Sequence, residues 1–299
     1  MGHRPVVFAS LATASALILG GCSSRADSGA NPTSIPNAYT KLPTTAAVGD
    51  CGPDSGATVA EGVLTIATDS PAYAPWIVDN DPSNGKGFEG AVARSVAETL
   101  GYRADQVVFV RVPFNDAIKP GEKNYDFDIN QVTIVGDRRE AVDFSSPYYA
   151  VAQSVVAMEG TPAAAIDSLD ALAPFRLGAQ SGSTSLASIT GTIRPSREPV
   201  EFATNDEAKA ALVAGTIDAL VVDIPTGFQI TATDLPNSKL IGQFPRPNTV
   251  TEFFGLVLEK NSPMTACTSA AVDALYADGT LDQLAQTWLA DTAGVPILN

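Results

Sequence analysis

Histidine is almost absent from this sequence: the 299 residues contain a single one, His3, at the extreme N-terminus. His3 falls in a segment predicted to be removed on secretion, which would leave the mature chain without imidazole. That excludes Ser–His and Cys–His nucleophile pairs and imidazole metal sites. The stretch "GAQSGSTS" has the glycines and hydroxyls of a phosphate-binding loop but lacks its lysine, and no G-x-G-x-x-G follows a predicted strand. The sequence therefore predicts no catalytic residue, no metal site and no cofactor.

Positive charge is also scarce. There are 18 Lys and Arg against 33 Asp and Glu, a formal net charge of −15. The longest basic cluster is the pair Arg138–Arg139, and phosphate backbones need clustered Lys and Arg, so nucleic acid is excluded as a partner. Among the acids, Asp126 and Asp128 would face one side of a strand, as a glycosidase carboxylate pair could. A turn aspartate and a strand-edge aspartate explain them more simply.

Only one long apolar run occurs, and it lies near the N-terminus. It extends from Val6 to Leu19, after Arg4, and ends in "LGGC". It is too short and wrongly flanked for a spanning helix and is typical of a secretory signal. The ending resembles the bacterial lipobox, which predicts a lipoprotein signal peptide over residues 1–21 and lipid on Cys22. Two or more acyl chains would anchor the protein firmly to the outer face of the cytoplasmic membrane. A plain secretory signal with a chance cysteine is the alternative.

Cysteine is limited to three residues. If Cys22 carries lipid, Cys51 and Cys267 remain as an even pair in an oxidising compartment. This predicts a disulfide between the N-terminal extension and a helix near the C-terminus. Two unpaired thiols are the alternative.

Past the signal, the chain changes character near residue 60. Residues 22–60 are rich in Ser, Thr, Pro, Gly, Ala and Asp, with almost no large apolar side chains, which predicts a flexible tether. From residue 62, strand and helix patterns alternate, as in "GVLTIAT" followed by "GFEGAVARSVAETLGY". This alternation predicts an α/β fold with largely parallel sheets. The long predicted strands 151–158 and 252–258 break the rhythm and are candidates for crossovers between two lobes.

Polar residues follow several predicted strands. Asp69, Gln180 and Asp223 come at the ends of "LTIAT", "RLGA" and "ALVV". In open α/β sheets ligands bind at the carboxyl ends of strands, so these positions direct the search for a site.

The residues present suit the recognition of a free amino acid. An α-carboxylate needs a guanidinium with hydroxyl donors, which Arg138 and Thr133 could supply. An α-ammonium needs a buried carboxylate, such as Asp223. Aromatic walls are available from Tyr73, Trp76 and Phe114.

Longer motifs resemble those of the family 3 extracellular solute-binding proteins, the polar amino-acid receptors of ABC importers. The similarity extends over residues 62–291 and includes "GVLTIATDSPAYAPW", "DFDINQVTIVGDRREAVDFSSPYY", "LGAQSGSTS", "IDALVVD" and "DGTLDQLAQTWL". Each motif alone is weakly specific, whereas together they are highly specific. The resemblance implies a type II periplasmic-binding-protein fold: two lobes, each with a mixed, mostly parallel sheet flanked by helices, joined by two hinge strands. Lobe 1 is predicted over 61–152 plus 254–299, and lobe 2 over 153–253.

The same resemblance implies roles for particular residues. Arg138 and Thr133 match the groups that hold the α-carboxylate, and Asp223 matches the carboxylate that receives the α-ammonium. The other matching positions around the ligand are Asn130, Gln131, Ser183, Thr184, Asp69, Tyr73, Phe114 and Gln180.

The chain departs from the family pattern in three places. Val135-Gly136-Asp137 replaces Thr-Pro-Glu before Arg138, which removes a helix cap and a rigid turn. One residue is inserted between Asp69 and Tyr73. Gln180 stands where some glutamine-type receptors have Lys, which disfavours an acidic ligand unless Arg111 points inward.

Several simpler interpretations stay open. Arg138 could be a solvated helix residue paired with Asp137 or Glu140, and Asp223 could merely cap the helix that follows it. Trp76 could line the pocket or lie on a lobe surface.

The function expected from the resemblance is that of a secreted, lipid-anchored binding protein rather than an enzyme. It would capture a polar or basic amino acid and deliver it to the membrane permease of an ABC importer. The alternatives are an amino-acid-sensing receptor on the same fold and, less favoured, an enzyme of the cyclohexadienyl dehydratase type.

Overall fold

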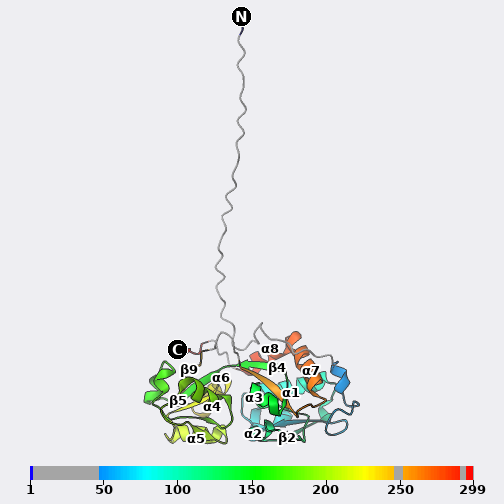
Figure 1. The fold of residues 1–299 in the computed structure, drawn as a ribbon, viewed down its shortest axis with the longest axis horizontal. Coiled ribbons are helices and arrows are strands. Elements are labelled where there is room, and N and C mark those ends of the chain that lie inside the picture. Colours follow the sequence, from blue (N-terminus) through cyan, green and yellow to red (C-terminus); the bar gives the residue numbers. More distant parts are fainter. Residues whose placement is uncertain (3–46, 246–251, 290–293, 299) are drawn as a thin grey trace.

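Two five-stranded sheets organise the chain, and each forms the centre of one lobe (Figure 1). The computed structural model describes residues 1–2, 47–245, 252–289 and 294–298. The predicted signal peptide and Cys22 lie outside these ranges. Within them, no helix combines the length and the apolar character needed to span a membrane.

The first lobe is built on a sheet with the order β2-β1-β3-β10-β4. Its strands are β1 (Leu64–Thr68), β2 (Val107–Arg111), β3 (Phe127–Asp128), β4 (Asp143–Val151) and β10 (Glu252–Leu258). β1 pairs in parallel with β2 and β3, whereas β10 runs antiparallel to β3 and β4. The apolar and β-branched sequence of β1 is buried along its whole length, as expected for a central strand.

Helices cover both faces of this sheet. They are α1 (Phe88–Thr99), α2 (Phe114–Ala117), α3 (Gly136–Ala141), α7 (Thr265–Ala277) and α8 (Thr280–Trp288). α1, α7 and α8 contact one another over the larger core, whereas Phe114 and Val142 belong to a smaller cluster that includes Phe144 and Val257 of the sheet. Residues of these short helices reach the second lobe, since Arg138 of α3 bonds to Gly182 and Asn115 of α2 lies next to it.

The second lobe repeats the arrangement, with the order β7-β6-β8-β5-β9. Its strands are β5 (Gln153–Met158), β6 (Leu177–Gln180), β7 (Val200–Phe202), β8 (Ala219–Asp223) and β9 (Ser238–Gln243), and its helices are α4 (Thr184–Ser188), α5 (Asn205–Val213) and α6 (Ile224–Gln229). β6 is parallel to β7 and β8, and β5 is antiparallel to β8 and β9. The mixed, two-lobed α/β architecture predicted from the sequence is confirmed.

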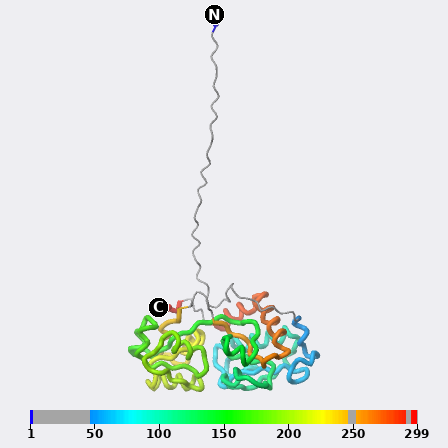
Figure 2. The backbone as a smooth tube through the Cα atoms, viewed as in Figure 1, coloured from blue at the N-terminus to red at the C-terminus, as the bar shows by residue number. Residues whose placement is uncertain are grey.

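The chain crosses between the sheets on two neighbouring strands (Figure 2). One crossing leads from β4 to β5 through Ala152, and the other reaches β10 from the second lobe. β4 and β10 pair antiparallel up to Val151 and Glu252, so the crossings lie side by side. The two predicted crossover strands are therefore confirmed, whereas the residue boundaries given for the lobes stay predictions.

The segment before β1 packs on the first lobe. Cys51 and Cys267 form the predicted disulfide, with 6.1 Å between their Cα atoms. Tyr102 donates a hydrogen bond to the carbonyl of Cys51 at 3.0 Å, and Val59 donates its backbone N–H to Asp126 at 2.8 Å. The prediction of a flexible tether is therefore wrong for residues 47–60, because the disulfide and these bonds hold a segment whose composition alone could not.

The last described residues reach the second lobe. Leu298 donates its N–H to the carbonyl of Gln243 at 2.9 Å, and Gln243 donates its own to Pro296 at 2.8 Å. Leu298 is buried in the second core. These residues belong to the segment that the sequence prediction grouped with the first lobe.

Candidate functional site

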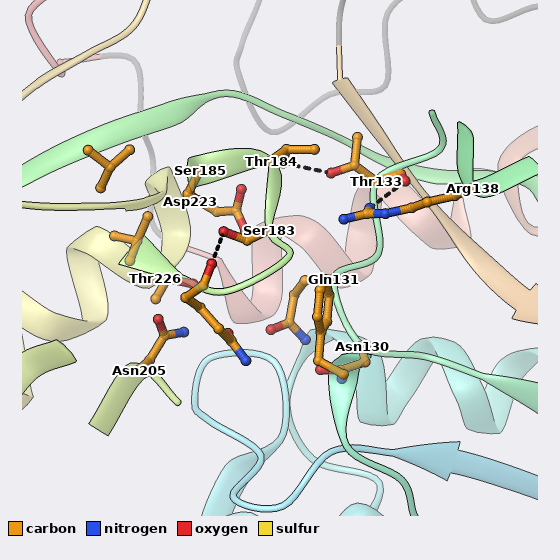
Figure 3. Close-up of a pocket in the computed structure, with 14 residues that line it drawn as sticks. Asn130, Gln131, Thr133, Arg138, Ser183, Thr184, Ser185, Asn205, Asp223 and Thr226 are labelled. Carbon is orange, nitrogen blue, oxygen red and sulfur yellow. Dashed lines mark hydrogen bonds between the residues drawn. The ribbon is translucent and has the colours of Figure 1, made fainter. Parts of the chain in front are cut away.

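A cavity between the lobes gathers polar side chains from both of them (Figure 3). It holds about 480 Å³, including the part open to solvent. Of the twelve residues predicted around a ligand, those that line it are Phe114, Asn130, Gln131, Thr133, Arg138, Gln180, Ser183, Thr184 and Asp223. Their shared cavity is a structural fact, and their contact with a ligand stays a prediction.

Arg138 on α3 supplies the cavity's cation. Its side chain is buried, with 9% of its surface exposed. Nη1 donates to the carbonyl of Thr133 at 2.7 Å, and Nη2 donates to the carbonyl of Gly182, in the other lobe, at 2.8 Å. The guanidinium also lies 5.4 Å from the ring centre of Phe114, a cation–π contact. Carbonyls and a ring fix the side chain without neutralising it.

The environment of Arg138 decides between its two interpretations. A solvated helix residue would be exposed and paired with Asp137 or Glu140, whereas Arg138 is buried and bonds to carbonyls. Burial lowers the pKa of Arg138, and the nearby carboxylates of Glu252 and Asp223 raise it; a guanidinium stays charged under these conditions. The altered Val135-Gly136-Asp137 stretch leads into α3 without a side-chain cap, yet Arg138 still reaches Thr133.

Asp223 supplies the carboxylate on the opposite side of the cavity. It ends β8 and occupies the N-cap position of α6, but its side chain makes no capping bond. Its Oδ1 instead accepts a hydrogen bond from Nε2 of Gln153 at 2.8 Å, so the capping interpretation is wrong. Burial first, and then the charge of Glu252, raise the pKa of Asp223 to about 8.

Hydroxyl groups from the two lobes meet above these charges. Thr133 Oγ1 and Thr184 Oγ1 lie 3.1 Å apart (Figure 3). Ser183 caps α4 by accepting from the N–H of Leu186, and its hydroxyl donates to the carbonyl of Gln180 at 2.6 Å. Thr133 therefore contacts Arg138 through its carbonyl and Thr184 through its hydroxyl.

Gly182 allows the lobes to approach this closely. Its φ is +74°, in the left-handed region that side chains disfavour. A Cβ there would also collide with Oδ1 of Asn115 in the first lobe. A glycine is needed here both for the backbone conformation and for the contact between lobes.

Gln131, one of the amide residues that line the cavity, is held in place by the buried acid Glu89. Gln131 has a φ of +48°, and its backbone N–H donates to Glu89 Oε1 at 2.7 Å. The Gln131 side-chain amide and the Tyr148 hydroxyl also donate to the Glu89 carboxylate. Burial raises the pKa of Glu89 to about 7, against the effect of these three bonds. Glu89 thus fixes an unfavourable backbone conformation next to the cavity.

Trp76 is a correction to the predicted site. Its side chain is wholly buried, so it neither lines the pocket nor lies on a lobe surface. The ring makes edge contacts with Phe88, Tyr149 and Phe254. Its indole N–H donates to Thr226 Oγ1 of the second lobe at 2.9 Å. The large apolar indole ring is more stable in the core than in a polar cavity, provided that its one N–H donor is paired, as it is here with Thr226.

Asp69 and Tyr73 also lie off the cavity lining. Asp69 follows β1, as predicted, and its carboxylate accepts the N–H of Ser70 at 2.6 Å; burial raises its pKa. Tyr73 contacts α5, where its hydroxyl accepts the N–H of Asp206 at 3.3 Å and Lys209 lies 5.1 Å from its ring centre. Arg111 donates to the carbonyls of Asp69 and Asn80 and does not line the cavity.

Several lining residues escaped the sequence reasoning: Ser185, Asn205, Val221, Val222 and Thr226. Ser185 follows the predicted pair Ser183 and Thr184, and Asn205 starts a recognisable helix, so proximity to a helix start could have suggested both. Nothing in the local sequence pattern marks Thr226 or the two buried valines, whose positions depend on how the lobes meet.

The fold and the cavity define a class: type II periplasmic binding proteins, in which two lobes enclose a ligand. The chain belongs to the bacterial extracellular solute-binding proteins, family 3, whose sequence profile it matches over residues 64–291. This is a family of binding proteins rather than enzymes, and the disfavoured enzyme alternative is set aside.

Relatives and solved structures agree with this assignment. The chain is 28% identical to the ABC transporter glutamine-binding protein GlnH of Bacillus subtilis (strain 168), covering 70% of this chain and 75% of that one. It is 27% identical to the L-arginine-binding protein of Pseudomonas aeruginosa, over 74% and 88%. An ancestral arginine-binding protein bound to glutamine is 26% identical, over 76% and 97%, with a TM-score of 0.62.

Proposed function

We propose that this protein captures a polar or basic amino acid between its lobes and delivers it to the membrane permease of an ABC importer. The observation that carries the proposal is the placement of a guanidinium and a carboxyl group across one cavity: Arg138 on the first lobe and Asp223 on the second. A zwitterion complements both. The ligands named for relatives support this class, since glutamine, arginine, histidine, cystine, lysine and ornithine are all amino acids.

The α-carboxylate is proposed to bind at Arg138. This guanidinium has five N–H donors. Two of its nitrogens donate to carbonyls, and among the residues that the structure describes no carboxylate forms an ion pair with it. Thr133 and Thr184, whose hydroxyls contact each other, line the same cavity, and Thr184 is the first residue of α4. Charge-assisted hydrogen bonds of this kind are the strong ones.

The α-ammonium is proposed to bind at Asp223. Its carboxylate lines the cavity and accepts one hydrogen bond, from the Gln153 amide, so it keeps acceptor capacity. An ammonium would lower the pKa of Asp223 from about 8, because an opposite charge favours the ionised form.

The ligand side chain is proposed to meet an amide-rich wall. Asn130, Gln131, Gln180 and Asn205 line the cavity, and Phe114 provides the apolar surface. Amides both donate and accept hydrogen bonds, which suits amide or cationic side chains better than aliphatic ones. No lysine lines the cavity among the described residues, which disfavours an acidic ligand.

Closure follows from bonds that cross between the lobes. Arg138 bonds to Gly182, Thr133 to Thr184, and Trp76 to Thr226. A ligand that contacts both lobes adds to these bonds only when the lobes are together, and so shifts the population towards the closed form. The same grip would serve a sensory receptor; transport is proposed because a relative is named as part of an ABC transporter.

Titration calorimetry of the full-length protein in detergent against the twenty L-amino acids tests this function. We expect one-to-one binding of at least one polar or basic amino acid. Absence of binding across the whole panel would contradict the proposal.

Anchoring is proposed through lipid on Cys22, at the end of "LGGC". Mass spectrometry of the mature protein should find a diacylglycerol thioether on Cys22. The C22S variant should lose membrane association while keeping amino-acid affinity. An unmodified Cys22 in the mature, membrane-bound protein would refute the anchor without affecting the binding function.

A further inference from the structure

Two polar side chains stand where the chain crosses between the lobes, one on each crossing strand. Gln153 begins β5, directly after the first crossing, and Glu252 begins β10 at the second. Gln153 is buried and Glu252 is partly buried. Both contact residues that line the cavity, so the site continues into the hinge.

The Gln153 amide bridges two carboxylates. Its Nε2 donates to Asp223 Oδ1 at 2.8 Å and to Glu252 Oε2 at 3.0 Å. The Ser185 hydroxyl donates to its Oε1 at 2.6 Å, which fixes the end of the amide that faces the carboxylates. One nitrogen thus donates in two directions to two carboxylates. An ammonium group, with three N–H donors, is suited to the same pair of acceptors.

Glu252 is also connected to the proposed carboxylate end of the site. Thr184 Oγ1 donates to Glu252 Oε2 at 3.0 Å and lies 3.1 Å from Thr133 Oγ1. Because the one hydroxyl proton of Thr184 goes to Glu252, Thr133 donates to Thr184 in this structure and would turn its proton to a bound carboxylate. Glu252 therefore contacts a lining residue directly and orients the hydroxyl pair beside Arg138.

Four ionisable side chains lie around this point on four elements: Arg138 of α3, Asp223 of β8, Glu252 of β10 and Glu89 of α1. After burial, Glu252 is the largest cause of the raised pKa of Asp223; Glu89 also raises it, and Arg138 and the bond from Gln153 lower it. Asp223 and Glu252 lie on either side of one neutral amide. One positive charge bound between them would therefore be favourable.

We propose that Glu252 is a second carboxylate of the ammonium site, and that the ligand's ammonium displaces a proton held on Asp223 beside it. This rests on the proposed amino-acid function. The displaced proton is released to solvent, so the ligand's ammonium replaces the proton as the positive charge at this site. The site therefore selects ligands that carry an α-ammonium. Protons compete with the ligand, so affinity rises with pH up to about 8, where Asp223 ionises without a ligand.

The proton count tests this directly. The full-length protein in detergent is titrated at pH 7 with the tightest-binding of the twenty L-amino acids, in phosphate and in Tris, whose ionisation enthalpies differ. We expect the wild type to release about one proton per ligand. Glu252→Gln keeps an acceptor for Gln153 and Thr184 but removes the charge, and should release about half as much or less.

Glu259→Gln is the matched control, since Glu259 directly follows the last residue of β10, at the end far from Glu252. It should leave the proton count unchanged. No proton release by the wild type would overturn the proposal, whatever the variants do. Equal release by the wild type and by Glu252→Gln would also overturn it.

A second measurement uses the 2-hydroxy acid with the side chain of the same amino acid, which has no ammonium. Glu252→Gln should reduce the preference for the amino acid over the hydroxy acid by about tenfold, the lower range for a hydrogen bond to a charged group. An unchanged preference removes Glu252 from the ammonium site and leaves the proposed function intact. If the wild type binds no amino acid at all, the proposed function itself fails.

Discussion

The two lobes share one strand order, yet different interactions stabilise them. The first packs an aromatic cluster of Trp76, Phe88, Tyr148, Tyr149 and Phe254 under helices of up to 13 residues, and carries the disulfide. The second has mainly aliphatic cores on the two faces of its sheet, and its α-helices have nine residues or fewer. In the part of the chain that the structure describes, its strands and helices contain no disulfide.

This difference matches what each lobe brings to the cavity. The first lobe provides a cation that contacts the Thr133 carbonyl and the Phe114 ring, and the second provides a carboxylate and the starts of short helices. A ligand with both charges is needed to satisfy both lobes. We infer that the first lobe is the more rigid of the two and that the second lobe moves towards it on closure.

The largest effect is expected at the cation of the first lobe. Arg138→Ala should weaken amino-acid binding by about 2–5 kcal/mol, because it removes a buried partner of the ligand carboxylate. Calorimetry measures this. Arg139→Ala, which removes the neighbouring exposed cation, is the control and should have little effect. Unchanged affinity in Arg138→Ala would remove Arg138 from the site.

Removal of the disulfide should separate the stabilities of the lobes. Replacement of Cys51 and Cys267 by Ser frees a link between residues 216 positions apart. The free energy of unfolding should fall by about 2–4 kcal/mol. Hydrogen exchange should show faster opening in α1 and α7 than in β6 and β8. An equal loss of protection in both lobes would contradict the view that the disulfide stabilises the first lobe specifically.

Glu89 should make the first lobe pH-sensitive. An unfolded glutamate ionises near 4.5, whereas burial holds the proton on Glu89 up to about pH 7. The folded state binds more protons between these values, so this contribution to stability is complete below pH 4.5 and is lost as the pH rises through 7. The gain in unfolding free energy from Glu89→Gln should therefore be about 2–3 kcal/mol larger at pH 8 than at pH 5.

Denaturant unfolding at the two pH values measures this difference. Both proteins carry Asp223→Asn in this comparison, because Glu89 also raises the pKa of Asp223 and the contribution of Asp223 would otherwise differ between them. A difference that does not depend on pH would show that Glu89 is ionised in the folded protein at pH 5.

The smallest effect is expected at the hydroxyl contact between lobes. Thr184→Val should weaken ligand binding by about 1 kcal/mol, the usual net contribution of a neutral hydrogen bond. Calorimetry against the same change at exposed Thr190 gives the comparison. A loss as large as that of Arg138→Ala would mean that the second lobe, and not the first, provides the main carboxylate contact.

Much of this arrangement could be predicted because it depends on local pattern. Alternating strand and helix signals indicated the α/β class, and Asp69, Gln180 and Asp223 do follow strands β1, β6 and β8. The spacing from Thr133 to Arg138 was enough to bring both to one cavity. The even cysteine count after Cys22 correctly indicated the disulfide.

Other features depend on contacts between distant segments, which local pattern does not encode. Trp76 looked like a pocket wall, but the aromatic cluster offered greater burial and Thr226 a partner for its N–H. The composition of residues 47–60 predicted a flexible tether, because it does not reveal the Cys51–Cys267 disulfide that holds this segment on the first lobe.

The sequence by itself determined the alternation of strands and helices and the acidic net charge. It also determined the short spacing that lets Arg138 bond to Thr133. The tertiary structure alone decided which acids share a site, because Asp223 and Glu252 come together only where two strands cross between lobes. Burial at that crossing, and then the charge of Glu252, raise the pKa of Asp223, although the two acids are distant from each other in the chain.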